Sequence, residues 1–595
     1  MKKPNFKEPH AKDTNIKEPR VNERIMQYLK PYAAYVVLAP LAMVLEVIMD
    51  LLQPALMATV VNDGILSGNV CVIASSCIKM ILAAIVGMVG GVGCTVFAML
   101  ASQNFGADLR GGLFRKIESF SFNEIDKFTT GSLVTRLTND VMQLQNLVSM
   151  ALRMFVRSPL LCIGSIFMTL SISIRYGVIL LLCFPVYIAL IMFFMKKTTP
   201  VFLAIQKKID RLNAILQENL SAVRVIKAFV RGDYERRRFE GANEDLTKTS
   251  LYVMNIMAII NPIMMIMMNA VVIAVIYIGG YQVQAAELRV GNVMAAISYM
   301  TQILMTFMMI GMVFFIVPRA KASADRITEV LSVKPAISDG GAAGEVSRGT
   351  IKFENVSFAY AGGSGELALK NISLEIGAGE RVGILGSTGA GKSTLVSLIP
   401  RFYDATSGRV LIDDMDIREY DLSALRSKIG VVLQESVLFS GTMAENIRWG
   451  RPDAGDGEVT DAASAAQADE FIGAMPDGYA SMLGQRGLTL SGGQKQRACI
   501  ARALVKQPRI LILDDCTSAL DLGTESRLSA AIDAAGPDCT RITIAQRIMS
   551  VMRSDRIFVM EGGEIAAVGT HDELLADSAI YRDIYRSQMG QEATA

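Results

Sequence analysis

A glycine-rich loop carries the strongest chemical signal in this 595-residue chain. The apolar run Arg381–Leu385 leads into GSTGAGKST, which fits the pattern GxxxxGK[ST] from Gly386 to Ser393 in a strand–loop–helix context. Glycines allow successive backbone N–H groups to point at phosphate oxygens, and the following helix adds its positive end. The sequence therefore predicts a nucleotide-phosphate site made by Gly386, Ser387, Thr388, Gly389, Ala390, Gly391, Lys392, Ser393 and Thr394.

A metal position accompanies this loop. The pattern predicts that Lys392 reaches the β and γ phosphates and that Ser393 binds Mg²⁺. Downstream, the apolar run Ile510–Leu513 ends in Asp514, whose carboxylate can hold the same ion at the carboxyl end of a strand. The site is therefore expected to bind a nucleoside triphosphate with Mg²⁺.

A second anion-binding nest is predicted between these two motifs. A serine hydroxyl and two glycines stand at the expected start of a helix, and they can present backbone N–H groups to phosphate. The residues of this LSGGQ motif are Leu490, Ser491, Gly492, Gly493 and Gln494.

The elements that must hold these motifs alternate along the second half of the chain. β-type runs such as IKFENVSFAY, RILILDD and RITIAQ are separated by helical stretches. This alternation is typical of a largely parallel sheet with helices packed on it. An α/β domain of the P-loop (RecA-like) type is therefore predicted for 346–595.

The first half is a membrane domain by composition. Hydrophobic residues make up 51% of the chain and charged residues only 19%, which is more apolar than soluble proteins. Apolar runs predict an all-α domain over 22–325, preceded by a cytoplasmic tail 1–21 and followed by a linker 326–345. Its six spans are expected at about 33–58, 78–103, 155–175, 176–195, 251–281 and 290–318.

Charge sets the expected orientation. Segments 1–30, 104–157 and 196–248 hold 27 Lys and Arg residues, whereas the opposite side holds two, Arg175 and Arg289. The basic segments should face the cytoplasm, which places both termini inside. The net charge of +2 leaves no basic excess for binding nucleic acid, and the eight cysteines form no CxxC pair. Cys71 and Cys77 could form a disulfide or remain free thiols.

The order of Tyr360, phosphate loop, Gln434, LSGGQ and Asp514, behind six predicted spans, resembles a half-size ABC exporter of the multidrug and lipid type. The resemblance implies an ABC nucleotide-binding domain with an α-helical subdomain, with ATP and Mg²⁺ as ligands. Tyr360 would then stack on adenine, and Gln434 would touch Mg²⁺. The resemblance also implies a dimer in which Leu490–Gln494 and Asp521 of one chain contact ATP held by the other. The tips of the cytoplasmic arms, 121–128 and 222–229, match the coupling helices of the family.

Two catalytic positions depart from the family pattern. The glutamate expected after the Mg²⁺ aspartate is replaced by Asp515, and the switch histidine by Gln546, while the two histidines of the chain, His10 and His571, lie elsewhere. These changes resemble the degenerate-site half of a heterodimeric bacterial exporter, whose partner carries the competent residues. A homodimeric lipid or peptide exporter with slow hydrolysis, or an ATP-gated regulatory membrane subunit that does not pump, are the alternatives.

The transported compound leaves weaker traces in the sequence. Glu46 and Asp50 lie four apart in the first span and share a helix face, which predicts contact with a cationic substrate. The alternatives are a structural hydrogen bond to Asn or Gln of neighbouring spans or, for Asp50, a position near the outer interface. Methionines such as Met305 and Met309 in the sixth span suit a surface that fits hydrophobic ligands, although they also serve as packing. A hydrophobic or amphipathic substrate, exported from the cytoplasmic membrane of a bacterium, is the expectation.

Overall fold

The chain folds into two compact units. In this computed structural model the described residues are 25–341, 344–360, 365–484, 487, 490–517, 522–536 and 538–589. The first unit contains the described residues up to Ile117 together with Gly131–Ser332, and the second contains Glu118–Thr130 together with the described residues from Val333 onward. The predicted tail 1–21 lies outside the described residues.

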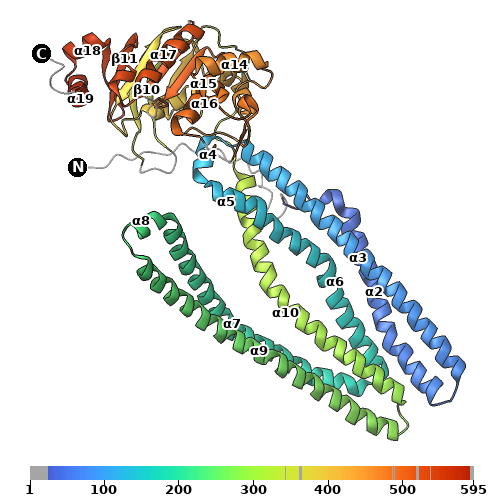
Figure 1. The fold of residues 1–595 in the computed structure, drawn as a ribbon. Coiled ribbons are helices and arrows are strands. Elements are labelled where there is room, and N and C mark those ends of the chain that lie inside the picture. Colours follow the sequence, from blue (N-terminus) through green and yellow to red (C-terminus); the bar gives the residue numbers. More distant parts are fainter. Residues whose placement is uncertain are drawn as a thin grey trace, which may run out of the picture. The chain divides into compact units, whose positions relative to one another are not determined.

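The first unit is built from long helices (Figure 1). Two of them include π-helical segments, η2 (Val60–Ile65) after α2 and η3 (Arg136–Asp140) before α6. The elements are η1 (Lys30–Tyr32), α2 (Ala33–Thr59), α3 (Val70–Glu118), α5 (Thr130–Thr135), α6 (Val141–Ile172), α7 (Ile174–Ser221), α8 (Val223–Ala228), α9 (Gly232–Gln284) and α10 (Val290–Ser332).

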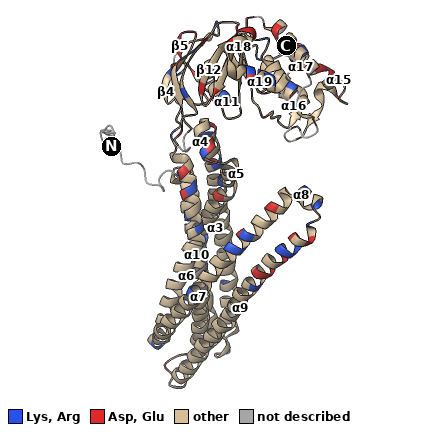
Figure 2. Cartoon of the chain, turned by 90° about the vertical axis from the view of Figure 1, so that its left-hand side faces the viewer, with Lys and Arg blue, Asp and Glu red and all other residues tan. Residues whose placement is uncertain are grey.

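Length and hydropathy support a membrane domain. Five helical stretches of the described residues are long and apolar enough to cross a bilayer, namely Lys30–Ile65, Val70–Glu118, Thr130–Ile172, Ile174–Ser221 and Gly232–Gln284. The sixth long helix, α10, contains the uncharged run 290–318. Figure 2 shows that charged residues concentrate at one end of these helices, toward α5 and α8.

Two predicted boundaries need correction. The spans are the apolar centres of much longer helices, and the break between α6 and α7 falls at the extended residue Ser173 rather than at 175. The linker 326–345 begins only after Ser332, because Ile327 and Val330 continue a buried face of α10 although charged residues interrupt the apolar run.

Close helix packing explains one glycine of α3. A Cβ atom at Gly90 would lie 2.8 Å from the carbonyl oxygen of Ala42 in α2, so a larger residue would force the two helices apart. Around this point a small-residue core joins α2, α3 and α6, and it contains Ala39, Met43, Val47, Cys94, Ala98, Ala101 and Leu152. Cys71 and Cys77 both lie in α3 as free, exposed thiols.

An ionic lock joins the base of α6 to α10. Asp140, at the end of η3, is buried, and its carboxylate accepts hydrogen bonds from Arg326 Nε at 2.8 Å and from Ser323 Oγ at 2.9 Å. Beside it, Arg136 Nη2 pairs with Glu329 at 2.8 Å. Because a buried charge is costly unless it is paired, these contacts hold the two helices in one register.

The second unit is an α/β domain with two main sheets. Among its described residues, six strands form a sheet in the order β12-β11-β3-β10-β9-β6, in which only β12 is antiparallel to its neighbour, and four form an antiparallel sheet β2-β1-β4-β5. The strands are β1 (Ile351–Phe358), β2 (Leu369–Ile376), β3 (Arg381–Gly386), β4 (Ser407–Ile412), β5 (Met415–Asp416), β6 (Ile429–Val432), β7 (Gly441–Thr442), β8 (Met482–Leu483), β9 (Ile510–Asp514), β10 (Thr540–Ala545), β11 (Arg556–Glu561) and β12 (Glu564–Gly569).

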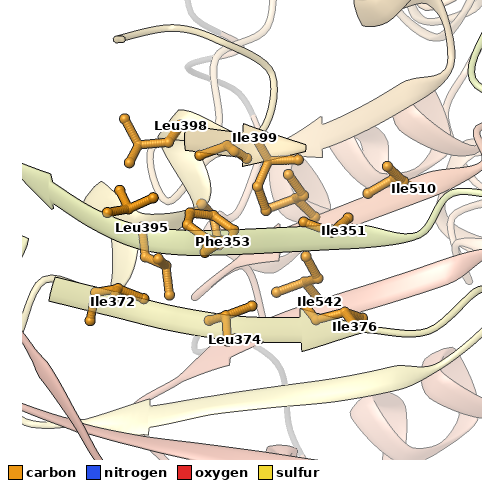
Figure 3. Packing of buried hydrophobic residues seen from close by; sticks show 14 of the residues in the cluster. Ile351, Phe353, Ile372, Leu374, Ile376, Leu395, Leu398, Ile399, Ile510 and Ile542 are labelled. Carbon is orange, nitrogen blue, oxygen red and sulfur yellow. The ribbon is translucent and has the colours of Figure 1, made fainter. Parts of the chain in front are cut away.

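The core of this domain lies between the two sheets. Figure 3 shows Ile351, Phe353 and Leu374 of the antiparallel sheet beside Leu395 of α11 and Ile542 of β10, and all belong to one buried cluster. The remaining helical elements are α11 (Lys392–Leu398), α12 (Leu422–Ser427), α13 (Met443–Arg448), α14 (Asp456–Ala465), α15 (Asp469–Gly473), η4 (Gly478–Ala480), α16 (Gly492–Leu504), α17 (Leu522–Ala535), η6 (Ile548–Ser550), α18 (His571–Asp577) and α19 (Ala579–Met589). A second buried cluster joins α13, α14, α15 and α16, the predicted helical subdomain, to β9.

The tip of the first arm belongs to this second unit. Helix α4 (Phe122–Lys127) is closed by a capping box between Ser121 and Glu124. The Phe122 ring lies 4.6 Å from that of Phe402, and the hydroxyl of the buried Tyr403 donates to Asp126 at 2.7 Å. The arm tip predicted at 121–128 therefore rests on residues that follow the phosphate loop helix.

The ionic lock should be a main source of stability in the helical unit. Replacing Asp140 by Asn weakens the charge-assisted hydrogen bonds that the buried carboxylate accepts from Arg326 and Ser323, and we expect the free energy of unfolding to fall by about 2 kcal/mol. Unfolding of the purified protein by titration with sodium dodecyl sulfate would measure this loss. Glu244→Gln, which breaks the exposed pair between Glu244 and Lys248, is the matched control and should change little. Equal losses in the two variants would contradict the role given to Asp140.

Candidate functional site

Strand order gathers the predicted motifs at one edge of the parallel sheet. Strand β10 pairs with β3 on one side and with β9 on the other, so that Ala545 lies opposite Leu385 and Ile544 opposite Asp514. Strand β6 lies beyond β9. Since parallel strands end at the same edge, the phosphate loop, Asp514, Gln546 and Gln434 all emerge there.

Three glycines with different structural roles determine the shape of the phosphate loop. A Cβ atom at Gly386 would lie 2.4 Å from the carbonyl oxygen of Met560, so this glycine permits the loop to leave the sheet beside β11. Gly389 and Gly391 have φ of +85° and +96°, values that side chains disfavour. Gly391 is also the N-cap residue of α11, so its conformation starts the helix whose N-terminus faces the loop.

Lys392 is folded back onto its own loop. The ammonium donates to the carbonyl oxygens of Gly386 and Ser387, each at 2.8 Å. Burial lowers the pKa of Lys392, and the nearby carboxylates of Asp515 and Asp514 partly oppose that shift. The ammonium is thus held within the loop by two carbonyl oxygens, near the carboxylates of Asp514 and Asp515.

Ser393 and Asp514 form an oxygen pair suited to Mg²⁺. Ser393 Oγ, in the first turn of α11, donates at 3.0 Å to Oδ1 of Asp514, the last residue of β9. Burial raises the pKa of Asp514, while the hydrogen bond from Ser393 lowers it. Hard oxygen donors of this kind fit Mg²⁺, and Ser393 and Asp514 would be the residues that hold it. When bound, the ion would neutralise charge that develops on the phosphates.

Asp515 and Gln546 meet directly. Gln546 Nε2 donates to Asp515 Oδ2 at 3.0 Å, and Asp515 has a left-handed backbone with φ of 45°. Burial raises the pKa of Asp515, while the hydrogen bond from Gln546 and the charge of Lys392 lower it. The two residues that depart from the family pattern are therefore partners in one hydrogen bond.

Tyr360 lies at the rim of the same site. Its hydroxyl is 2.9 Å from Thr394 Oγ1, and its ring packs edge-on against Tyr403 with 5.4 Å between centroids. The residue is 40% exposed. Gln434 follows β6 as an exposed side chain.

The LSGGQ motif starts helix α16. Ser491 is the N-cap residue, and its hydroxyl accepts from the backbone N–H of Gln494 while the Gln494 side chain accepts from the backbone N–H of Ser491. Ser491 and Gly492 are exposed, and Leu490 packs against the helical-subdomain core. Asp521 lies outside the described residues.

The acidic residues of the first span have a basic partner. Arg157 of α6 contacts Glu46 Oε1 at 2.7 Å and Asp50 Oδ2 at 2.9 Å, both in α2. Hydrogen bonds to Asn or Gln were the predicted structural alternative, whereas Arg157 was counted with the basic segment 104–157 and not as a partner of these acids. Met305 and Met309 lie on α10 with half-exposed side chains, whereas the charged cluster is built by α2 and α6.

Two further contacts were not predicted from the sequence. Tyr403 joins Asp126 of α4 to the ring of Tyr360, and Gln588 of α19 contacts the backbone of Gln546. Neither residue stands in a recognisable motif. The only signal in the sequence was an acidic residue at the arm tip, Asp126, which indicated a polar partner on the nucleotide domain.

Comparison with known proteins agrees with this geometry. Residues 36–307 match the ABC transporter transmembrane region, and residues 369–518 match the ABC transporter family. YfiB of Bacillus subtilis, an ABC transporter ATP-binding protein, is 41% identical over 96% of this chain and 99% of its own length. YgaD of the same organism, a putative multidrug export ATP-binding/permease protein, is 33% identical over 96% and 99%. The structure of a bacterial Atm1-family ABC exporter with ATP bound superposes with a TM-score of 0.75 at 26% identity, over 96% of this chain and 99% of that one.

These matches confirm the predicted fold class, because the helical membrane domain and the α/β domain of this one chain both match those of ABC transporters. The nucleotide site described above is an ATP site by the same comparison. The chain belongs to the ABC transporter family, and it is a multi-pass ABC exporter with a fused ATP-binding domain that acts as an ATPase and translocase.

Proposed function

We propose that this chain is one half of a heterodimeric exporter, and that its own site holds ATP with little turnover while its LSGGQ motif completes a competent site on the partner. The observation that carries this proposal is the hydrogen bond between Asp515 and Gln546. In this proposal the two substituted residues stand where the family activates water and senses the γ-phosphate, and the hydrogen bond joins them to each other.

The chemistry of this pair disfavours hydrolysis. Asp515 is one methylene shorter than glutamate, and a displacement of about 1 Å can cost on the order of 100-fold in rate. Burial raises the pKa of the Asp515 carboxyl, and the Gln546 amide occupies one of its oxygens. A neutral amide also cannot supply the positive charge of an imidazolium to a transition state.

The elements that bind ATP are by contrast complete. Lys392, the loop glycines and the hydrogen-bonded pair Ser393–Asp514 would hold Mg²⁺ and ATP in this proposal. Phosphoryl transfer depends on positioning and electrostatics, so a site that loses its base can still bind ATP tightly. ATP at this site would then act as a stable clamp between two subunits.

The LSGGQ motif is available for a partner. Its helix is capped internally by Ser491 and Gln494, yet Ser491 and Gly492 remain exposed at the N-terminus of α16. Exposed N–H groups at a helix start favour an anion. An ATP held by the partner's phosphate loop supplies that anion.

Two apolar surfaces also favour a dimer. The second arm tip, around α8, exposes Leu220, Val225, Phe229 and Val230. On the nucleotide domain, Phe439 and the single tryptophan Trp449 stack at 4.5 Å beside a cavity of about 490 Å³. We propose that the α8 tip of each subunit docks at this cavity on the other, as the coupling helices of the family would.

The substrate proposal rests on the helical unit. The cluster of Glu46, Asp50 and Arg157 has two negative charges for one positive, within helices that are otherwise apolar. A hydrophobic or amphipathic compound, drug or lipid, with a positive group would meet complementary charge there. Basic residues gather on the cytoplasmic arms near α8 (Figure 2), which favours both termini in the cytoplasm and a location in the bacterial cytoplasmic membrane.

Restoring the missing groups tests the degenerate site. The purified chain alone should bind ATP and hydrolyse it very slowly. The double substitution Asp515→Glu with Gln546→His should raise its ATPase rate at least tenfold, because both a longer base and an imidazole return. Lys392→Ala, which removes the phosphate contact, is the control for contaminating activity. Rapid hydrolysis by the unaltered chain would refute the proposal, and would favour a homodimeric exporter.

The position of the competent site can be tested in the complex purified with its natural partner. Ser491→Ala should depress steady-state ATPase activity several-fold, because Ser491 would contact ATP on the partner. Asp515→Asn should have a much smaller effect, since little hydrolysis is expected at its own site. Similar losses in both variants would count against assigning the competent site to the partner.

A further inference from the structure

The C-terminal helix α19 is anchored against the strands that carry the phosphate and switch loops. Tyr581 is fully buried in a cluster with Leu385 of β3, Ala545 of β10 and Ile548 of η6. Its hydroxyl lies 2.6 Å from His571 Nδ1, and burial raises the pKa of Tyr581 to about 12, so that the hydroxyl keeps its proton. The one histidine of the described residues therefore supports a helix rather than a phosphate.

Gln588, near the end of α19, makes two hydrogen bonds to residues 546–548, which we call the switch segment. Its Nε2 donates to the carbonyl oxygen of Gln546 at 2.8 Å, and its Oε1 accepts from the backbone N–H of Ile548 at 2.8 Å. One side-chain amide thus satisfies backbone groups on both sides of Arg547. These two bonds restrain the backbone at Gln546, whose side chain donates to Asp515.

Open space separates Gln588 from the phosphate loop. A cavity of about 430 Å³ is lined by Ser387 and Thr388 of the loop, by Gln546, and by Ile584 and Gln588 of α19. Gln588 hydrogen-bonds the backbone of the switch segment, and so any influence on nucleotide would be transmitted through Gln546.

We propose that Gln588 is a positioning residue for the ATP site. By holding the backbone at Gln546 and Ile548, it places the Gln546 amide for contact with the γ-phosphate and thereby sets the preference of the site for ATP over ADP. This inference rests on the proposed function in one respect, namely that Gln546 stands at the γ-phosphate position. It assigns to the C-terminal helix a role in nucleotide discrimination.

Nucleotide binding to the purified full-length chain in nanodiscs tests this role. Calorimetry with Mg²⁺ would give the dissociation constants of ATP and of ADP, and their ratio is the readout. Gln588→Met keeps the length and packing of the side chain but removes both hydrogen bonds. We expect it to lower the preference for ATP about fivefold, the size of one net hydrogen bond, with ADP affinity unchanged. A purely structural role would shift both affinities or the melting temperature.

Two further variants make the outcome decisive. Ser587→Ala, at the neighbouring exposed position, should leave the ratio unchanged. Gln546→Ala should lower the ratio, and adding Gln588→Met to it should lower it no further, because both act through one contact. An additive effect would overturn the proposal, as would an unchanged ratio in Gln588→Met alongside a lowered one in Gln546→Ala. An unchanged ratio in Gln546→Ala would also overturn it, and that result would remove the role of Gln546 in the proposed function as well.

Discussion

The pairing of β10 between β3 and β9 is the constraint on which the nucleotide site depends. Its register sets Ala545 opposite Leu385 and Ile544 opposite Asp514. The phosphate loop, Asp514 and Gln546 therefore lie at the same level along the edge of the sheet. A slip of one residue would turn every side chain to the opposite face. The buried isoleucines and leucines of these strands, packed between two sheets, prevent such a slip.

Charge at this edge is arranged around Lys392. The ammonium lies among two loop carbonyls and near two aspartates, and burial disfavours each charged group on its own. Their mutual attraction offsets part of that cost and prepares the site for phosphate and Mg²⁺. The substitutions at 515 and 546 keep this balance, because aspartate retains the negative charge and glutamine retains a hydrogen-bond donor. What changes is the reach of the carboxylate and the charge of the donor, and in the proposed function these changes impair hydrolysis more than binding.

Contacts from outside the sheet bear on the same edge. Helix α4 meets Tyr403, whose ring lies against Tyr360, and α19 meets the backbone of Gln546. The arm tip and the C-terminal helix thus contact opposite ends of the site, one near the adenine position and one near the γ-phosphate position of the proposed complex. Movement of α4 would reach the proposed nucleotide site through packed rings, and movement of α19 would reach it through hydrogen bonds.

The sequence by itself determined the architecture and the motifs, because these depend on local patterns. Uncharged runs predicted membrane helices, alternating apolar runs predicted the sheet, and GSTGAGKST and LSGGQ carry their own turn and helix-capping chemistry. Helix ends were less predictable, since α10 continues through charged residues on the strength of one buried face. Only the tertiary structure decided which distant side chains meet: Arg157 with Glu46 and Asp50, Tyr403 with Asp126, and Gln588 with the switch segment. Such pairs join residues separated by tens to hundreds of positions, and their chemistry is common to many exposed side chains, so spacing along one chain cannot reveal them.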